Sequence, residues 1–145
     1  MGERCKKRLG EKEKEIGLMN NIVLDTDIFV DFLRGFEKAK RFFEEIKQDN
    51  LIVYFSAVTE TELISGNECN KIERKAEILS ILANFNKVSV SNEIAIKAGD
   101  FSRVYNVETA DAIIASTAFV MKANLVTRNV EDYKRIKDIK LKTPY

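Results

Sequence analysis

The stretch at residues 21–33, NIVLDTDIFVDFL, decides the fold of this chain. It begins with a short apolar run, reaches the two acids Asp25 and Asp27, and continues with apolar residues at helical spacing. This pattern predicts a buried strand that leads directly into an amphipathic helix. Ligands of open α/β sheets bind at the carboxyl ends of the strands. We therefore expect the first strand to end at a functional site.

Apolar runs alternate with segments of helical spacing along the rest of the chain. The runs that predict strands are 22–24, 51–55, 88–90, 125–126 and 139–141. The segments that predict helices are 28–34, 37–47, 57–64, 72–85, 93–105 and 109–123. This alternation is typical of an α/β fold with a central, mainly parallel sheet and helices on its faces. The only proline is Pro144, so none of these helices is interrupted by one.

The length and composition predict one folded domain. The chain has 145 residues, of which 45% are apolar and 32% charged, which is enough for one core and too short for two. Residues 1–18 mix basic and acidic side chains with little periodic apolar content, so we expect a flexible N-terminal arm there. The alternative is a mis-annotated start, because Met19 directly precedes the first strand. The folded domain is expected to span residues 19–145.

The charge balance excludes a general attraction to polyanions. The chain carries 24 basic and 23 acidic residues, and six of the basic and four of the acidic residues lie in positions 1–18. The remainder therefore has a formal charge of −1. Any nucleic-acid contact must come from local basic groups or from a bound metal ion.

The absence of histidine excludes several kinds of chemistry. Ser-His-Asp and Cys-His catalysis both need a side chain that this sequence does not contain. The two cysteines, Cys5 and Cys69, are not in a CxxC pair, so we expect structural thiols and no zinc site. No apolar run approaches the roughly 20 residues of a membrane span, and no signal peptide is evident, so we expect a soluble, cytoplasmic protein.

Three further places repeat the pattern of a strand followed by polar residues. Glu62 follows the second predicted strand, Asp111 opens the apolar helix at 109–123, and Asn129 and Asp132 follow the run at 125–126. Acids at helix N-termini also act as caps, and that alternative applies to Asp111 as it does to Asp27. Carboxylates that converge at one sheet edge repel one another unless a divalent cation neutralises them. An oxygen-only site predicts Mg²⁺ or Mn²⁺.

Four motifs carry a resemblance to a known family. In order and spacing, DTDIFVDFLRG, SAVTETELISG, TADAIIASTA and LVTRNVEDYKRI resemble the motifs of PIN-domain ribonucleases, most closely the VapC-type toxins of prokaryotic toxin–antitoxin pairs. The resemblance covers about residues 21–141 and implies that residues 19–145 form a PIN domain, a three-layer α/β fold. It implies a metal-dependent endoribonuclease that hydrolyses RNA phosphodiester bonds. It also implies a small antitoxin as partner and a homodimer.

The resemblance assigns roles to individual residues. It implies that Asp25, Glu62 and Asp111 bind the Mg²⁺ or Mn²⁺ ion and take part in catalysis. Aspartate is common in the family where this chain has Asn129, and related members carry an acid three residues later, where Asp132 lies. Either residue can therefore complete the site, with Asp132 as the catalytic candidate of the two.

Four basic residues flank these motifs and are candidates for phosphate contacts with RNA. They are Arg34, Lys38, Arg128 and Arg135. For each of them the alternative is a solvated surface charge.

Three other functions remain open at this point. A PIN nuclease of RNA processing without an antitoxin would have much the same sequence, and a non-catalytic PIN-like binding module would keep some of the acids as caps. The DxD pattern of Asp25 and Asp27 also opens the haloacid-dehalogenase phosphatases. That family has a threonine two residues after the second aspartate, where Phe29 stands here.

Overall fold

The computed structural model describes residues 21–145, so the predicted arm at residues 1–18 lies outside the described residues. The described part contains a five-stranded sheet in the order β3-β2-β1-β4-β5, and every neighbouring pair is parallel. The first strand along the chain is thus the central strand of the sheet. The strands are β1 (Asn21–Leu24), β2 (Ile52–Ser56), β3 (Asn86–Val88), β4 (Asn124–Val126) and β5 (Leu141–Lys142).

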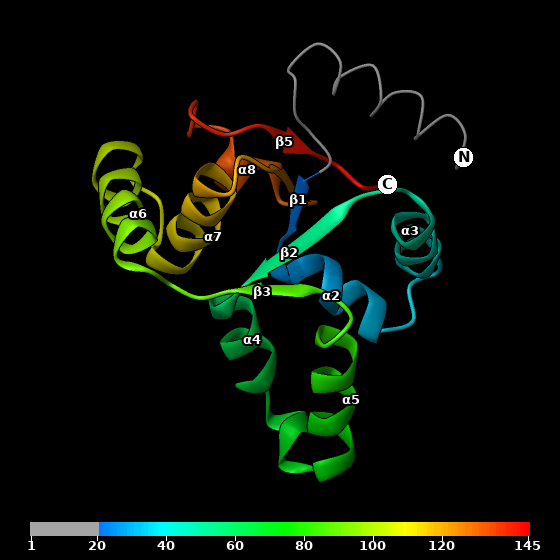
Figure 1. Cartoon of the computed structure of the whole chain (residues 1–145). Coiled ribbons are helices and arrows are strands. Elements are labelled where there is room, and N and C mark those ends of the chain that lie inside the picture. Colours follow the sequence, from blue (N-terminus) through cyan, green and yellow to red (C-terminus); the bar gives the residue numbers. More distant parts are fainter. Residues whose placement is uncertain (1–20) are drawn as a thin grey trace.

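Helices connect the strands and form a layer on each face of the sheet. Figure 1 shows α6 and α7 on one side of the strands and α2 and α3 on the other. The helices are α2 (Thr26–Leu33), α3 (Glu37–Gln48), α4 (Ala57–Ile64), α5 (Ile72–Leu82), α6 (Asn92–Tyr105), α7 (Thr109–Val120) and α8 (Val130–Tyr133), with a short 3₁₀ helix η1 (Asn67–Asn70). The structure therefore has the predicted three layers.

Two hydrophobic cores separate these layers, and β1 contributes to both. Ile22 and Leu24 pack in the core that contains residues of α2, α3, α4 and α5, whereas Val23 packs in the core that contains residues of α6 and α7. Successive side chains of a strand point to opposite faces, which explains the division. β1 is thus buried on both faces, and Asp25, which follows it, is buried as well.

The predicted alternation of strands and helices is confirmed, with shifts at two strands. The third strand ends at Val88 rather than at residue 90, because Ser91 caps α6 by accepting a hydrogen bond from Ile94 N at 3.2 Å. The last strand begins at Leu141, two residues later than predicted, since it pairs with Leu125 in the register of β4. Ile139 packs against the core instead.

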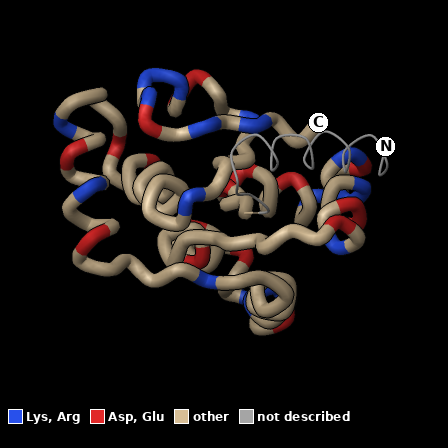
Figure 2. The backbone as a smooth tube through the Cα atoms, turned by 45° about the horizontal axis from the view of Figure 1, so that its top comes forward, with Lys and Arg blue, Asp and Glu red and all other residues tan. Residues whose placement is uncertain are grey.

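Charged residues of both signs are interspersed over the outer helices (Figure 2). This distribution agrees with the near-neutral charge of the sequence. In the part of the chain that the structure describes, no helix is long and apolar enough to cross a membrane.

Candidate active site

The predicted site residues gather at the carboxyl edge of the sheet. Asp25 directly follows β1, Glu62 lies on α4 just beyond β2, and Asn129 lies in the turn after β4. Asp111 reaches the same place from the first turn of α7, which packs against β1. Because β1 lies between β2 and β4, these segments surround Asp25.

Asp25 is the most buried of these acids and is also the cap of α2. Its Oδ1 accepts a hydrogen bond from Thr26 N at 2.8 Å, and its Oδ2 accepts one from Thr127 Oγ1 at 2.8 Å. Only 5% of the residue is exposed. Burial, and secondly the charge of Asp27, raise the pKa of Asp25 to about 7, although its hydrogen bonds act in the opposite direction. An ionised carboxylate in this buried position lowers the stability of the fold unless a positive charge lies close to it.

Asp111 and Asp25 are linked by a residue that the sequence analysis did not single out. The hydroxyl of Tyr133, at the end of α8, lies 3.1 Å from Asp25 Oδ1 and 3.3 Å from Asp111 Oδ1. The fourth motif contains this tyrosine, but an aromatic residue beside a short helix predicts only a core position. A buried tyrosine hydroxyl needs a hydrogen-bond partner, and this requirement could have identified Tyr133 as a residue of the site.

The surroundings of Asp111 are acidic. Burial is the largest cause that raises its pKa, followed by the charge of Asp132, with smaller contributions from Glu62 and Glu108; the hydrogen bond from Tyr133 opposes them. Asp111 does not cap α7, because Glu108 holds the N-cap position and makes no side-chain capping bond. The capping alternative therefore does not explain Asp111.

Glu62 is exposed and turns toward the start of α2. Its Oε1 accepts a hydrogen bond from Thr26 Oγ1 at 2.6 Å, and Thr26 Oγ1 also lies 2.9 Å from Thr59 Oγ1. The residue after Asp25 thus brings the carboxylate of the second motif to the same helix N-terminus.

The two candidates for the fourth position are joined to each other. Asn129 Nδ2 donates a hydrogen bond to Asp132 Oδ2 at 2.6 Å, while Asn129 N donates one to Thr127 Oγ1 at 2.9 Å. Through Thr127 this turn is tied to Asp25. The structure therefore brings both residues of the fourth motif to the site.

Asp27 has a different role from the cap of α2. Its Oδ2 accepts a hydrogen bond from Arg128 N at 3.1 Å, and its Oδ1 is buried without a hydrogen-bond partner in the described structure. Burial is the main cause that raises the pKa of Asp27. The capping alternative for Asp27 is not needed, because the N-cap of α2 is Asp25.

The four basic candidates differ in their surroundings. Arg128 Nε lies 2.6 Å from Asp31 Oδ2 in an ion pair, and Tyr145 donates its hydroxyl hydrogen to the same oxygen at 2.6 Å. Arg135 Nη1 donates to the carbonyl oxygen of Tyr105 at 3.4 Å. Arg34, the C-cap residue of α2, and Lys38 on α3 are both exposed. Of these four basic residues, Arg128 is thus the one that contacts with Asp27 and Asp31 hold close to the site.

These residues suit a hard divalent cation. The acids and Asn129 offer only oxygen ligands, one carboxylate is buried with a raised pKa, and Asp27 Oδ1 is a buried acceptor without a donor. Within residues 21–145, however, no three acidic or cysteine side chains already lie close enough to one another to hold one ion. The acids are instead engaged by Tyr133, Thr26 and Asn129.

The parallel sheet with helices on both faces and acids at its carboxyl edge is the α/β architecture that the sequence predicted. Comparison of the sequence with known protein families gives the same result. The pattern of the PIN domain matches residues 22–139. The chain therefore belongs to the PIN-domain family.

The chain is also similar to individual proteins of known name and to solved structures. Ribonuclease VapC19 of Mycobacterium tuberculosis is 30% identical over 131 residues, which cover 85% of this chain and 98% of the relative. Ribonuclease VapC10 of the same organism is 29% identical over 124 residues, which cover 82% and 90%. A structure of a toxin–antitoxin complex from Klebsiella pneumoniae contains a chain with a TM-score of 0.72 and 27% identity, with 86% of this chain and 98% of that one covered.

Proposed function

We propose that this chain is a metal-dependent endoribonuclease that hydrolyses RNA phosphodiester bonds, and that it is the toxin of a toxin–antitoxin pair. The similar proteins VapC19 and VapC10 are named ribonucleases, and a similar solved structure is a toxin–antitoxin complex. The observation that carries the nuclease proposal is the convergence of Asp25, Glu62 and Asp111 at one sheet edge. Membership of the PIN family excludes the haloacid-dehalogenase alternative.

Asp25, Glu62 and Asp111 would hold a Mg²⁺ or Mn²⁺ ion, with Asp132 or Asn129 as a further ligand. When bound, such an ion lowers the pKa of a water molecule and stabilises negative charge on a phosphoryl oxygen. The donor set supports this choice because it contains only oxygen atoms, and because the charges of Asp132 and Glu62 help to raise the pKa of Asp111.

Asp25 and Asp111 differ in how many of their carboxylate oxygens already accept hydrogen bonds. Both oxygens of Asp25 already accept hydrogen bonds, and the residue is buried. Asp111 is half-buried, and in the described structure its only hydrogen bond involves Oδ1. Asp111 Oδ2 is therefore open to a ligand, and Asp25 would anchor the ion at the buried end of the site.

Basic residues near the acids would bind the RNA backbone. Arg128 is held beside Asp27 and Asp31 by the contacts described above, and about half of its side chain is exposed. It can therefore bind a phosphate while it keeps its ion pair. Arg34, Lys38 and Arg135 would extend the contact along the strand of RNA, and their effect would depend on salt concentration.

The remaining elements of the proposal concern partners and location. A small antitoxin would inhibit the enzyme, two copies of the chain would form a homodimer, and the protein would act in the cytoplasm. The similar toxin–antitoxin complex supports the antitoxin.

The nuclease proposal is tested by cleavage of a mixed-sequence RNA with Mg²⁺ or Mn²⁺. We expect cleavage by the wild type, its loss in EDTA, and its loss in Asp25→Asn. Asp49→Asn is the matched control, because Asp49 is also a buried aspartate but precedes β2, at the opposite edge of the sheet. Equal cleavage by wild type and Asp25→Asn would refute the site. Folded wild type that neither cleaves RNA nor binds Mn²⁺ would favour the non-catalytic module.

A further inference from the structure

Tyr133 joins two of the proposed metal ligands through its hydroxyl. Its side chain is fully buried, and within the described residues the hydroxyl contacts only carboxylate oxygens, those of Asp25 and Asp111. A phenol ring in this position would pack equally well without the hydroxyl. The hydroxyl therefore serves the two acids.

The ring has little freedom to move away from them. Tyr133 packs in the same core as Val23, Ala112 and Leu125, which lie on β1, α7 and β4. Its hydroxyl carries a single hydrogen, which it can donate to either carboxylate or share between the two. It is a donor at a fixed position between two acceptors.

In each carboxylate the Oδ1 atom has more hydrogen-bond contacts than the Oδ2 atom. Asp25 Oδ1 accepts from both Thr26 N and Tyr133, whereas Asp25 Oδ2 accepts only from Thr127. Asp111 uses Oδ1 toward Tyr133, and its Oδ2 has no hydrogen bond within residues 21–145. The tyrosine thus engages the same oxygen of both side chains and leaves the other one for a ligand.

We propose that Tyr133 is a positioning residue for the divalent cation, because its hydroxyl orients Asp25 and Asp111 through their Oδ1 atoms and leaves their Oδ2 atoms to bind the ion. This inference rests on the proposed function. Groups that hold metal ligands in place typically change metal affinity by roughly 10- to 100-fold when removed. The hydroxyl of Tyr133 is such a group for two ligands at once.

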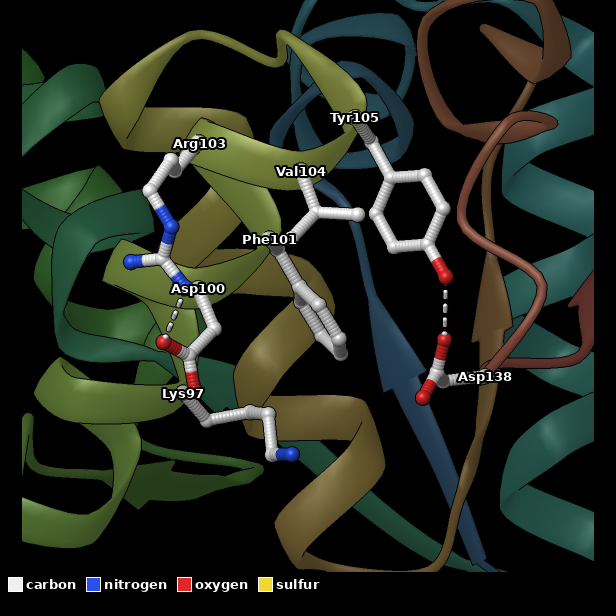
Figure 3. Close-up of a pocket in the computed structure, with 7 residues that line it drawn as sticks. All are labelled: Lys97, Asp100, Phe101, Arg103, Val104, Tyr105 and Asp138. Carbon is white, nitrogen blue, oxygen red and sulfur yellow. Dashed lines mark hydrogen bonds and ion pairs between the residues drawn. The ribbon is translucent and has the colours of Figure 1, made fainter.

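The test compares Tyr133→Phe with Tyr105→Phe by titration calorimetry with Mn²⁺ and no RNA. Tyr105 is the matched control, since its hydroxyl also donates to an aspartate, Asp138 at 2.7 Å, beside a surface pocket (Figure 3). We expect Tyr133→Phe to bind Mn²⁺ at least roughly 10-fold more weakly than wild type. Tyr105→Phe should match the wild type.

The outcomes separate this inference from the proposed function. Equal Mn²⁺ affinity of wild type and Tyr133→Phe would overturn the positioning role and leave the nuclease proposal intact. If the wild type binds no Mn²⁺, both are overturned. Equal losses in Tyr133→Phe and Tyr105→Phe would also overturn the inference, since a general effect of losing a tyrosine hydroxyl would then explain them.

A second measurement avoids dependence on the folding of Tyr133→Phe. The chain has four tyrosines, so ¹³Cζ-tyrosine labelling gives four resonances, and three can be assigned with Tyr54→Phe, Tyr105→Phe and Tyr145→Phe. Mg²⁺ should shift the remaining resonance, that of Tyr133, more than the resonance of Tyr105. No shift of the Tyr133 resonance at saturating Mg²⁺ would refute the role.

Discussion

Asp25→Asn should stabilise the metal-free protein at alkaline pH while it destroys the cation site. The pKa of Asp25 rises from its ordinary 3.8 to about 7 in the folded state. An acid whose pKa is higher in the folded state than in the unfolded chain lowers stability as the pH rises from 3.8 through about 7. Asparagine has no charge to bury and retains the Oδ1 that accepts from Thr26.

The size of the effect follows from the shift in pKa. A difference between 3.8 and about 7 corresponds to on the order of 4 kcal/mol of unfolding free energy at pH 8, where Asp25 is ionised in both states. At pH 5 the folded state keeps the proton, and the difference falls to about 2 kcal/mol. The gain of Asp25→Asn over wild type should therefore be about twice as large at pH 8 as at pH 5.

Urea unfolding in EDTA at pH 5 and pH 8 measures this difference. Added Mg²⁺ should narrow the difference at pH 8 to on the order of 1 kcal/mol, because an ion at 100 times its dissociation constant stabilises the wild type by about 2.7 kcal/mol and the variant has lost its charged ligand. Asp49→Asn is again the control. A variant less stable than wild type at pH 8 in EDTA, or an equal response of both proteins to Mg²⁺, would refute the reasoning.

Three further predictions concern the rest of the site and the chain ends. Asp132→Asn should weaken Mn²⁺ binding in calorimetry more than Asn129→Ala, because only the former removes a charge; unchanged affinity in both would mean that the site has three protein ligands. Tyr145→Phe should lower the unfolding free energy in urea by about 1 kcal/mol, since Asp31 loses a hydroxyl donor at 2.6 Å, and an unchanged midpoint would contradict this. Deletion of residues 1–18 should preserve RNA cleavage and melting temperature, and a large loss of either would show that the folded domain needs them.

The sequence predicted the architecture well because its pattern depends on local periodicity. Residues 57–64 were expected as a helix and form α4 with the same bounds, since Ser56 supplies the cap at its start. The third and fifth strands were misplaced by two residues. Their bounds depend on pairing with β2 and β4, which is set by tertiary structure.

The candidate site was predicted in part, for a similar reason. The acids that follow strands were identifiable, because the carboxyl ends of parallel strands share one edge. Tyr133 and Asp31 were missed, since Asp25 lies 108 residues from Tyr133, and the partners of Asp31 lie 97 and 114 residues from it. A local sequence pattern carries no information about a hydrogen bond between residues that lie so far apart in the chain. The direction of Glu62 toward Thr26 likewise required the structure.

The central position of β1 has a consequence for synthesis on the ribosome. Asp25 is among the first described residues to be made, but its hydrogen-bond partners Thr127 and Tyr133 come 102 and 108 residues later. Contacts between such distant segments form only after both have left the ribosome. A nascent chain that lacks β4 and α8 therefore has the first acid without the setting that completes its site. The site that would cut RNA is therefore complete only after the residues of α8 have been made.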